Sequence, residues 1–571
     1  MEIIEEIKKI IIESVKKSGI DFNEKEIKIE HPADINFGDY STNIAMILAK
    51  IKKDNPRQVA EKMLRQIQDV NCKFIEKVEV AGAGFINFYL KPEFLIKKAE
   101  SINYEIEFRN KLKENGNGKT MVIDYSAPNI AKPFGIGHLR STNIGQAIYN
   151  IYKILGWNCI GDNHIGDWGT QYGKLVAAIK KWNKKDLDNL TIDDLEKLYV
   201  RFHKEAETDE KLIEEGRDWF AKLENGDSEA RKIWQKCVDI SLIEFNKVYR
   251  LLGVQIDFIH GESFYEDKLE NVTREIIDKG ITKKSEGAII VEFANIPPAM
   301  LKKSNGTTTY FARDMATIKY RMENWKPNLI IYEVGVDQEL HFKQVFETAK
   351  MMGWMPDQGM IHIAHGLIRW TTGKFSTRKG DTIHLSDVID KAMEKAKEIA
   401  QKSTVNKNLS ATEKEEMIKS VAIGAIKFND LSSDPKKDVI FDWDQIMSLE
   451  GDSGPYLQYT YARCKSVLNK TKVKEQKNIG EINQNINEDE TVLTREFYKF
   501  EEKIIESSER FSPSVVAEYL LNVARKYNEF YAKNRIIDQK EEVFRVFLTR
   551  TTASIIEIGL DLLGINTIER M

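Results

Sequence analysis

The chain has 571 residues, of which 42% are hydrophobic and 30% are charged, and its formal net charge is −4. This length suits about three or four domains, and the composition is that of a globular protein rather than a disordered one. Because the net charge is slightly negative, any contact with nucleic acid must come from local basic patches. The four cysteines lie far apart, which argues against both a disulfide framework and a thiolate zinc site.

Residues 1–105 are predicted to form a separate α+β module. The amphipathic N-terminal segment lacks the apolar core of a signal peptide, and no run reaches the ~18 apolar residues of a membrane span, so we expect a cytoplasmic protein. A short strand and a helical stretch from Thr42 to Gln68 follow. Alternation over residues 77–90 then predicts a pair of strands. The glycines between them fit a turn or bulge better than a dinucleotide loop, because Asn87 takes the third glycine position.

A polar linker over residues 111–120 precedes the most informative stretch, MVIDYSAPNIAKPFGIGHLRSTNIG at 121–145. Residues 121–125 alternate as a short strand and end in a turn rich in Pro, Asn and Gly. The apolar spacing predicts a helix from about His138. A helix N-terminus after a glycine turn presents backbone N–H groups and a positive dipole end to an anion, usually a phosphate.

Three residues at this turn suit a phosphate ligand. Gly135 and Gly137 allow close approach to the backbone because they carry no Cβ, and an N–H of His138 could reach a phosphate oxygen. An ordinary tight turn with a surface histidine would explain a lone glycine pair. A second glycine loop that carries lysine, farther along the chain, favours a nucleotide.

The next segments predict a parallel sheet with an insertion. Residues 157–182 predict another strand, turn and helix, as a βαβ unit requires, and Trp168 is expected to be a packing residue. Residues 181–250 are highly charged with helical periodicity, and we expect them to be the core of an insertion between the two halves of a nucleotide-binding fold.

The second half of that fold carries polar candidates. Tyr310 and Asp314 are four residues apart, so one helical turn would place them on the same face. On spacing alone, a helix cap or a surface ion pair explains Asp314 better. Gln338 and His341 follow an apolar strand, at the kind of strand end where open α/β sheets bind ligands.

The loop GKFSTRKG at residues 373–380 combines three cations with two hydroxyls and suits a polyphosphate, although a solvated basic loop would normally be favoured. The nearby His362 and His365 could suggest a metal, but without an evident third ligand we interpret them as strand-end packing. From Asp387 to about Val439 helical periodicity returns.

The last part of the chain is predicted to be helical to its end. Tyr456, Tyr459 and Arg463 mix aromatic rings with a cation, a combination that suits single-stranded RNA. An amphipathic helix with a solvated basic face is an equally good explanation for any one of them.

Several of these sequence motifs resemble those of one protein family. SAPNIAKPFGIGHLRST, residues 126–142, resembles the first ATP-binding signature of class I aminoacyl-tRNA synthetases, and its flanking words are similar to those of arginyl-tRNA synthetases. GKFSTRKG resembles the second signature. Gly135 replaces the first histidine of the first signature, and Thr377 replaces the second lysine of the second. Lys132 stands where a lysine is thought to compensate in this family, and Arg378 could share the charge.

The resemblance spans nearly the whole chain and implies a multidomain α/β protein. It implies an N-terminal α+β module that binds the tRNA elbow (1–105) and a Rossmann-like catalytic domain (118–390) with an insertion at about 181–290. A helical connector (391–450) and an all-α helical-bundle anticodon-binding domain (451–571) would follow.

The resemblance also implies a function: ATP-dependent attachment of L-arginine to the arginine tRNA through an arginyl-adenylate. ATP would bring Mg²⁺ with it, without a dedicated protein metal site, and activation would wait for bound tRNA. A monomer is the default expectation. The alternatives are a tRNA-binding protein without synthesis, which the two signature departures would support, and a synthetase-like nucleotidyltransferase, which would have no evident use for the C-terminal helices.

The resemblance assigns candidate residues by role. The catalytic candidates are His138, Lys132, Lys374 and Arg378. The ATP-binding candidates are Phe134, Gly135, Gly137, His138, Gly366, Leu367, Lys374, Phe375 and Ser376. The arginine-binding candidates are Asp124, Ser126, Asn129, Tyr310, Asp314 and Gln338, with Asp314 accepting the guanidinium in a bidentate manner. The tRNA-binding candidates are Phe85, Asn87, Tyr456, Tyr459 and Arg463.

Overall fold

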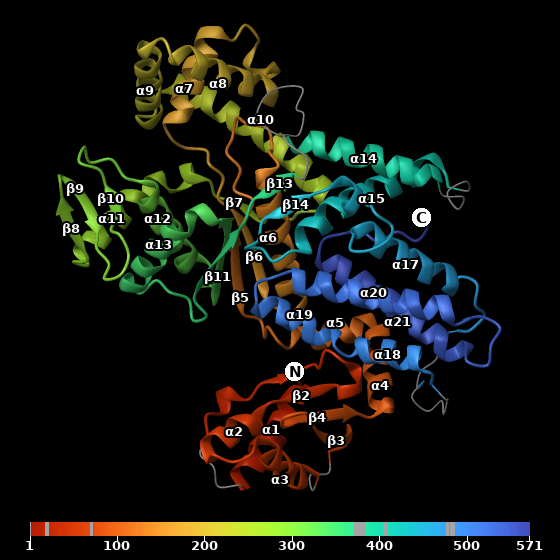
Figure 1. The fold of residues 1–571 in the computed structure, drawn as a ribbon. Coiled ribbons are helices and arrows are strands. Elements are labelled where there is room, and N and C mark those ends of the chain that lie inside the picture. Colours follow the sequence, from red (N-terminus) through yellow and green to blue (C-terminus); the bar gives the residue numbers. More distant parts are fainter. Residues whose placement is uncertain are drawn as a thin grey trace. The chain divides into compact units, whose positions relative to one another are not determined.

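The computed structural model describes residues 2–17, 22–68, 72–370, 384–402, 409–474, 479 and 486–571 (Figure 1). The chain forms two compact units. The first comprises Met1–Lys111, Arg463–Glu506 and Tyr519–Glu557, and the second comprises Leu112–Ala462, Ser507–Glu518 and Ile558–Met571. The predicted multidomain α/β fold is confirmed. None of the described helices is long and apolar enough to cross a membrane.

The N-terminal part of the first unit is an α+β module. Its helices are α1 (Glu2–Lys17), α2 (Ile44–Lys52) and α3 (Pro56–Gln68), with short 3₁₀ turns η1 (Glu24–Glu26) and η2 (Ile35–Phe37). Its antiparallel strands β1 (Ile29–Glu30), β2 (Tyr40–Thr42), β3 (Ile75–Ala81) and β4 (Phe85–Leu90) run in the order β1-β2-β4-β3. The strand pair predicted over 77–90 is the β3–β4 hairpin. The helical stretch predicted over 42–68 is two helices, because Lys53 is left-handed and Pro56 starts the next one.

Two further helices follow the N-terminal module, and five helices make up the described C-terminal end of the chain. They are α4 (Pro92–Asn103), α5 (Glu105–Lys113), α17 (Gly454–Leu468), α18 (Glu488–Phe497), α19 (Phe500–Glu509), α20 (Ser514–Lys533) and α21 (Glu542–Leu562). The expected C-terminal helices are thus present. The linker expected over 111–120 is shorter, because α5 continues to Lys113.

A five-stranded parallel sheet forms the centre of the second unit. Its strands are β5 (Thr120–Asp124), β6 (Asn158–Asn163), β7 (Phe258–Ile259), β11 (Leu329–Gly335) and β12 (Met360–His365), in the order β12-β11-β5-β6-β7. The chain builds outward from β5 through β6 and β7, and then returns to place β11 on the other side of β5. Open α/β sheets bind ligands at the carboxyl ends of strands at such a reversal.

Helices connect the strands of this sheet. They are α6 (Gly137–Ile154), α7 (Thr170–Trp182), α8 (Ile192–Ala206), α9 (Glu210–Glu224), α10 (Ser228–Leu252), α11 (Leu269–Asp278), α12 (Tyr310–Asn324) and α13 (Glu339–Met352), with 3₁₀ turns η3 (Leu187–Asn189), η4 (Glu262–Lys268) and η5 (Val336–Gln338). Helices α7–α10 lie between β6 and β7 in the sequence and pack against one another (Figure 1). The bounds of the insertion, about 181–290, stay a prediction. A small antiparallel sheet, β8 (Thr282–Ser285), β9 (Ala288–Val291) and β10 (Ala299–Lys302), precedes α12.

The segment after the sheet was expected to be a helical connector, and this was only partly correct. Two long helices are present, α14 (Leu385–Lys402) and α15 (Ala411–Leu431), with a short α16 (Trp443–Ile446). However, β14 (Val439–Phe441) pairs in parallel with β13 (Ile368–Trp370). Alternating burial of the three residues of β14 explains the strand.

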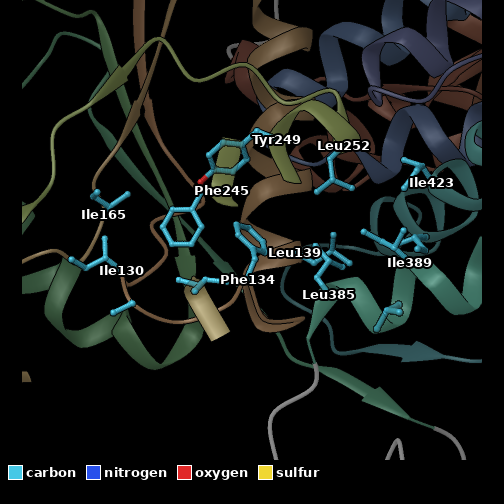
Figure 2. Close-up of a cluster of buried hydrophobic side chains, with 14 of the residues drawn as sticks. Ile130, Phe134, Leu139, Ile165, Phe245, Tyr249, Leu252, Leu385, Ile389 and Ile423 are labelled. Carbon is cyan, nitrogen blue, oxygen red and sulfur yellow. The ribbon is translucent and has the colours of Figure 1, made fainter. Parts of the chain in front are cut away.

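One apolar core joins the first-signature region to helices α10, α14 and α15 (Figure 2). Phe134 lies edge-on to Phe245 and Tyr249 of α10, with ring centroids 6.0 Å apart in both pairs. Leu139 of α6 and Leu385 of α14 belong to the same core. Burying each side chain of this size contributes about 1.5–3 kcal/mol, so the loop before α6 rests on a rigid support.

Candidate active site

The loop between β5 and α6 has an unusual backbone. Ser126, Ala127 and Ala131 are not glycines, yet their φ angles are 75°, 42° and 62°. Such left-handed residues persist only where the surroundings hold them, and they concentrate at functional sites. Here side chains hold the loop: the N–H of Ser126 donates to Ser141 Oγ (2.9 Å) and the N–H of Ala131 donates to Ser241 Oγ (2.8 Å).

His138 lies in the first turn of α6, where the sequence predicted a helix start. Its Nδ1 accepts the N–H of Gly135 at 3.3 Å. Burial lowers the pKa of His138, and the nearby Lys132 charge lowers it further. The neutral ring therefore carries its proton on Nε2, which is the nitrogen that can donate to a ligand. Among the described residues no side chain caps α6, so its N-terminus suits an anion.

A buried ion pair fixes α6 to α15. Arg140 Nε donates to Asp430 Oδ1 at 2.8 Å, and neither side chain is more than 2% exposed. Arg140 Nη1 also donates to the carbonyl of Lys437 (2.7 Å), and Asn143 Nδ2 donates to Asp430 Oδ2 (3.1 Å). The sequence reading did not single out this pair, because its partners lie 290 residues apart.

The structure places Tyr310 and Asp314 on the first turn of α12, as their spacing predicted. Asp314 Oδ2 lies 2.5 Å from His341 Nε2, and the rings of Tyr310 and His341 are 4.7 Å apart. Asp314 is therefore not a helix cap. His341 orients its carboxylate at the carboxyl end of the sheet, near the turn that follows β11.

Asp124 requires a correction. It was expected to offer a negative charge to the substrate. However, Arg321 of α12 already forms an ion pair with it, with Nη2 2.8 Å from Asp124 Oδ2. The same guanidinium binds Asp162 at 2.8 Å, and His260 Nδ1 lies 3.1 Å from the other oxygen of Asp162. Burial would raise the pKa of Asp162, but Arg321 and His260 outweigh burial and hold it low. Asp124 is thus a counter-ion of Arg321 within the protein.

Glu262 is a candidate that the sequence reading missed. It begins the 3₁₀ turn η4 after β7, and its N–H donates to the carbonyl of Ile165 at 3.1 Å. Burial raises the pKa of Glu262 to about 7; His164 and Arg313 oppose this rise, whereas the charge of Asp314 adds to it. The turn η4 lies against α12, where Arg313 Nε binds Glu266 Oε1 at 2.8 Å, so Glu262 and Asp314 belong to neighbouring elements. The turn η4 and helix α12 are close together only in the folded chain. No spacing in the sequence therefore predicted that Glu262 belongs to this site.

The other arginine candidates differ in their availability. Asn129 is exposed and forms a bridge with Gly166, and Gln338 ends η5 directly after β11. Ser126 is buried, and its hydroxyl is hydrogen-bonded to Tyr249 Oη and Thr142 Oγ1, both at 2.9 Å. Ser126 therefore shapes the loop from inside, whereas Asn129 and Gln338 can face a ligand.

The backbone at residues 366–367 was expected to line the adenine of ATP, and its N–H groups do not fit this role. The N–H of Gly366 donates to the carbonyl of Pro435 (3.0 Å) and that of Leu367 donates to Asp438 Oδ1 (2.8 Å). These bonds join residues 366–367 to the segment before β14. The Leu367 side chain is 59% exposed and is still able to contact a base.

The second signature lies outside the described residues, and with it Lys374, Phe375, Ser376 and Arg378. The chain on its C-terminal side returns to the first signature. The N–H of Leu385 donates to the carbonyl of Phe134 at 2.9 Å, and His384 forms an antiparallel bridge with Gly135. The first described residues after the second signature, His384 and Leu385, are therefore bound to the loop before α6.

The two histidines of β12 are packing residues, as the sequence reading proposed. His362 Nε2 bonds the carbonyl of Val334 at 2.9 Å, and His365 Nδ1 lies 3.0 Å from Glu333 Oε1. Burial opposes protonation of His365, but Glu333 outweighs burial and raises its pKa. In the part of the chain that the structure describes, no group of three His, Cys, Asp or Glu residues is placed to hold a metal.

The tRNA candidates also need correction. Phe85 is 43% exposed at the start of β4 and can stack on a base. Asn87 is buried and accepts a hydrogen bond from Ser41 Oγ at 2.7 Å, so it is not open to RNA. Tyr456 is buried as well, and Tyr459 packs against the main core.

Arg463 is engaged within the protein. Its Nη1 donates to Asn528 Oδ1, and its guanidinium lies 5.1 Å from the ring centre of Tyr531. The mixture of aromatic and basic residues on α17 thus reflects packing more than an open RNA surface.

Comparisons with known proteins agree with this geometry. Residues 102–443 match the model of the class I (R) tRNA synthetase catalytic domain. Residues 457–571 match the DALR anticodon binding domain, and residues 5–90 match the arginyl tRNA synthetase N-terminal domain.

Whole-chain relatives point the same way. The chain is 40% identical to an arginine–tRNA ligase of Clostridium kluyveri, over 99% of this chain and 100% of the relative. It is 39% identical to that of Halothermothrix orenii, with the same coverage. Its structure is similar to arginyl-tRNA synthetase from Plasmodium falciparum, with a TM-score of 0.83 and 26% identity over 99% of both chains.

Proposed function

The chain belongs to the arginyl-tRNA synthetases, and from this premise we propose that it attaches L-arginine to the arginine tRNA at the expense of ATP. The observation that carries the proposal is the meeting of two features at the carboxyl end of the sheet. One is the strained loop with neutral His138 at the mouth of α6. The other is the oriented carboxylate of Asp314, with Tyr310 on the same helical turn.

Arginine would bind with its guanidinium toward Asp314. A guanidinium offers donors in a rigid fork that a carboxylate accepts in a bidentate manner. Glu262, with its raised pKa, would supply the second acidic group in place of Asp124. Asn129, Tyr310 and Gln338 would orient the remaining polar groups. Lysine or citrulline would leave buried polar groups unpaired, and such a mismatch supports strong discrimination.

ATP would place its phosphates at the N-terminus of α6. The backbone at Gly137, Nε2–H of His138 and the ammonium of Lys132 would stabilise the negative charge that develops there, while the N–H of Gly135 holds Nδ1 of His138. Gly366 and Leu367 are proposed on the nucleotide side, whereas Phe134, expected there too, is buried in the core and supports the loop instead. Lys374, Phe375, Ser376 and Arg378 of the second signature, which lie outside the described residues, would also contact the nucleotide. Mg²⁺ carried with ATP would neutralise part of the phosphate charge.

The chemistry needs no protein nucleophile. A carboxylate oxygen of arginine attacks the α-phosphorus of ATP in line, pyrophosphate leaves, and arginyl-adenylate forms. A hydroxyl of the terminal ribose of the tRNA, the 2′-hydroxyl in the class I pattern, then attacks the carbonyl carbon, and AMP leaves. The protein contributes positioning and charge stabilisation, which can supply most of the acceleration in such reactions.

The first departure from the signature does not dismantle the site. Gly135 stands in place of a histidine, but its N–H holds Nδ1 of His138 and so fixes the tautomer of the remaining histidine. A tRNA-binding protein without synthesis would have no need for this arrangement or for an oriented Asp314.

The domain roles are part of the proposal. We assign residues 1–105 to binding of the tRNA elbow, with Phe85 as the described candidate, 118–390 with its insertion to catalysis, 391–450 to the connector, and 451–571 to the anticodon. The sites on the last domain are not Tyr456, Tyr459 or Arg463, whose side chains are used internally. The protein is proposed to act as a cytoplasmic monomer.

Arginine-dependent ATP–pyrophosphate exchange tests the first half-reaction. We expect exchange with arginine but not with lysine, and a large increase when the arginine tRNA is added. Equal exchange with both amino acids would reject the proposed pocket. Absence of exchange under every condition, in a protein that still binds tRNA, would favour the binding-protein alternative.

The raised pKa of Glu262 predicts a pH dependence of arginine binding. Below pH 7 Glu262 is mostly protonated, and a guanidinium must displace that proton to gain the carboxylate. The KM for arginine should therefore fall as pH rises, by about tenfold between pH 6 and 8. Steady-state kinetics at saturating ATP and tRNA measure this dependence. Glu262→Gln should flatten it, while Glu270→Gln, at an exposed position of α11, should leave it unchanged. A flat profile in the unmodified protein would contradict the assignment.

A further inference from the structure

A shielded polar cluster within the first unit joins the N-terminal module to helices near the C-terminal end of the chain. His31, which follows β1, places its Nε2 2.9 Å from Glu502 Oε2 of α19. Tyr40 of β2 donates its hydroxyl to the other oxygen of Glu502. The side chains of His31 and Glu502 are only 20% and 12% exposed, although they are 471 positions apart in the sequence. The module thus holds a distant helix through one carboxylate.

This carboxylate is kept charged by the N-terminal module. Burial would raise the pKa of Glu502, but the hydrogen bond and charge of His31, together with the hydroxyl of Tyr40, outweigh burial and hold the pKa below its usual range. His31 Nδ1 lies 2.8 Å from the carbonyl oxygen of Asp39. Both ring nitrogens of His31 therefore face oxygen acceptors, and the ring is fixed between Asp39 and Glu502.

A second set of contacts holds the same two parts together. Arg495 Nε of α18 lies 3.5 Å from Asp39 Oδ1, and Arg495 Nη1 donates to the carbonyl of Ile35 at 3.2 Å. Asp39 Oδ2 accepts the N–H of Leu90, the last residue of β4, at 2.7 Å. Tyr498, which follows α18, belongs to the apolar core of the N-terminal module. Ion pairs, hydrogen bonds and apolar burial thus oppose rotation of the module on these helices.

The cluster is connected through the sheet to Phe85, the candidate for the tRNA elbow. Tyr40 lies opposite Phe88 where β2 pairs with β4. Phe85 begins β4, and Asp39 holds the backbone at the other end of that strand. The partners of Glu502 and Arg495 therefore fix the strand that carries Phe85. Phe85 is held at a fixed span from α18 and α19.

We propose that the His31–Glu502 pair is a positioning device for tRNA: it fixes the span between Phe85 and the anticodon-binding helices, so that one tRNA engages both at once. The inference rests on the domain roles in the proposed function. When two sites are held at the span of their ligand, the second binding event is intramolecular, and overall affinity can exceed that of either site by about 10²- to 10⁴-fold. The gain is lost when the geometry prevents simultaneous binding. Neither His31 nor Glu502 has to touch RNA, in agreement with their shielded position.

Glu502→Ala tests this positioning role in the full-length protein. We expect the KM for arginine tRNA to rise about tenfold or more, while kcat at saturating tRNA and the KM for arginine stay unchanged. Binding of an RNA hairpin that contains only the anticodon stem and loop should also stay unchanged, because it occupies one site. Tyr40→Phe removes one hydrogen bond to Glu502 and should give a smaller change in the same direction. Glu509→Gln, at an exposed carboxylate of α19, is the matched control.

A double-mutant cycle with Phe85 separates alignment from local damage. Phe85→Ala alone should raise the KM for tRNA, but in the Glu502→Ala background it should add little, because the elbow contact is already lost. Thermal unfolding identifies any variant that does not fold, and Tyr40→Phe then takes the place of Glu502→Ala in the cycle.

Two results would overturn the positioning role. One is an unchanged KM for tRNA, or an effect additive with that of Phe85→Ala, in a folded variant. The other is hairpin binding that weakens as much as tRNA binding, because the damage is then local to the anticodon helices. If Phe85→Ala has no effect in the unmodified protein, the elbow assignment of the proposed function fails and the alignment fails with it. Additive effects with a working Phe85 reject the alignment alone, so the two failures are distinguishable.

Discussion

Asp314→Asn should lower kcat/KM for arginine by on the order of 10²- to 10³-fold while ATP binding stays largely intact. The substitution keeps the shape of the side chain but removes the charge that the guanidinium needs. Removing one partner of a buried charged hydrogen-bond pair costs about 2–5 kcal/mol, because the other charge is left unpaired. Steady-state exchange kinetics at varied arginine, together with equilibrium binding of ATP, measure the two effects separately.

The same helix offers a control for this variant. Glu323 lies near the end of α12, and its exposed side chain is 3.8 Å from Lys319. Glu323→Gln should change neither arginine nor ATP parameters, since exposed ion pairs contribute little. If Asp314→Asn weakened arginine and ATP equally, or neither, Asp314 would not be the guanidinium partner.

Arg321→Met should destabilise the catalytic unit strongly, by about 3–5 kcal/mol, because it leaves Asp124 and Asp162 buried without their counter-ion. Burial already raises the pKa of Asp124 against the effect of Arg321. Without Arg321 both carboxylates would have to take up protons or admit water. Thermal unfolding followed by circular dichroism would show the loss as a lowered transition for this unit.

A compensating variant separates loss of charge balance from loss of packing. Arg321→Met combined with Asp124→Asn and Asp162→Asn removes all three charges, and replacing a whole buried ionic group is often nearly neutral. We therefore expect the triple variant to unfold closer to the unmodified protein than the single variant does. Equal destabilisation of both would show that the three charges do not act as a unit.

The sequence predicted those parts of the fold that local pattern determines. The strand before the signature, the helix beginning near His138 and the pairing of Tyr310 with Asp314 on one helical turn are all confirmed. Each depends on periodicity or on glycine and proline within about 20 residues. The family resemblance rested on short sequence motifs of this kind, and it is confirmed over 99% of the chain.

Contacts between residues that are far apart in the sequence could not be predicted from local patterns. Asp124 looked like a free carboxylate because Arg321 follows it by 197 residues, and Glu262 was missed because only the fold brings η4 to α12. Asn87 belongs to a sequence segment that resembles a tRNA contact. In the folded strand, however, its side chain points inward and accepts a hydrogen bond from Ser41. Tyr456 was misjudged for a related reason: aromatic residues between cations on a helix serve a buried face as readily as an RNA surface.

Transfer of labelled arginine to purified arginine tRNA tests the central claim most directly. In the presence of ATP and Mg²⁺, we expect the protein to form acid-precipitable arginyl-tRNA with labelled arginine and none with labelled lysine. Asp314→Asn should abolish most of this product at the same arginine concentration. Charging of lysine, or intact tRNA binding without any arginylation, would contradict the account.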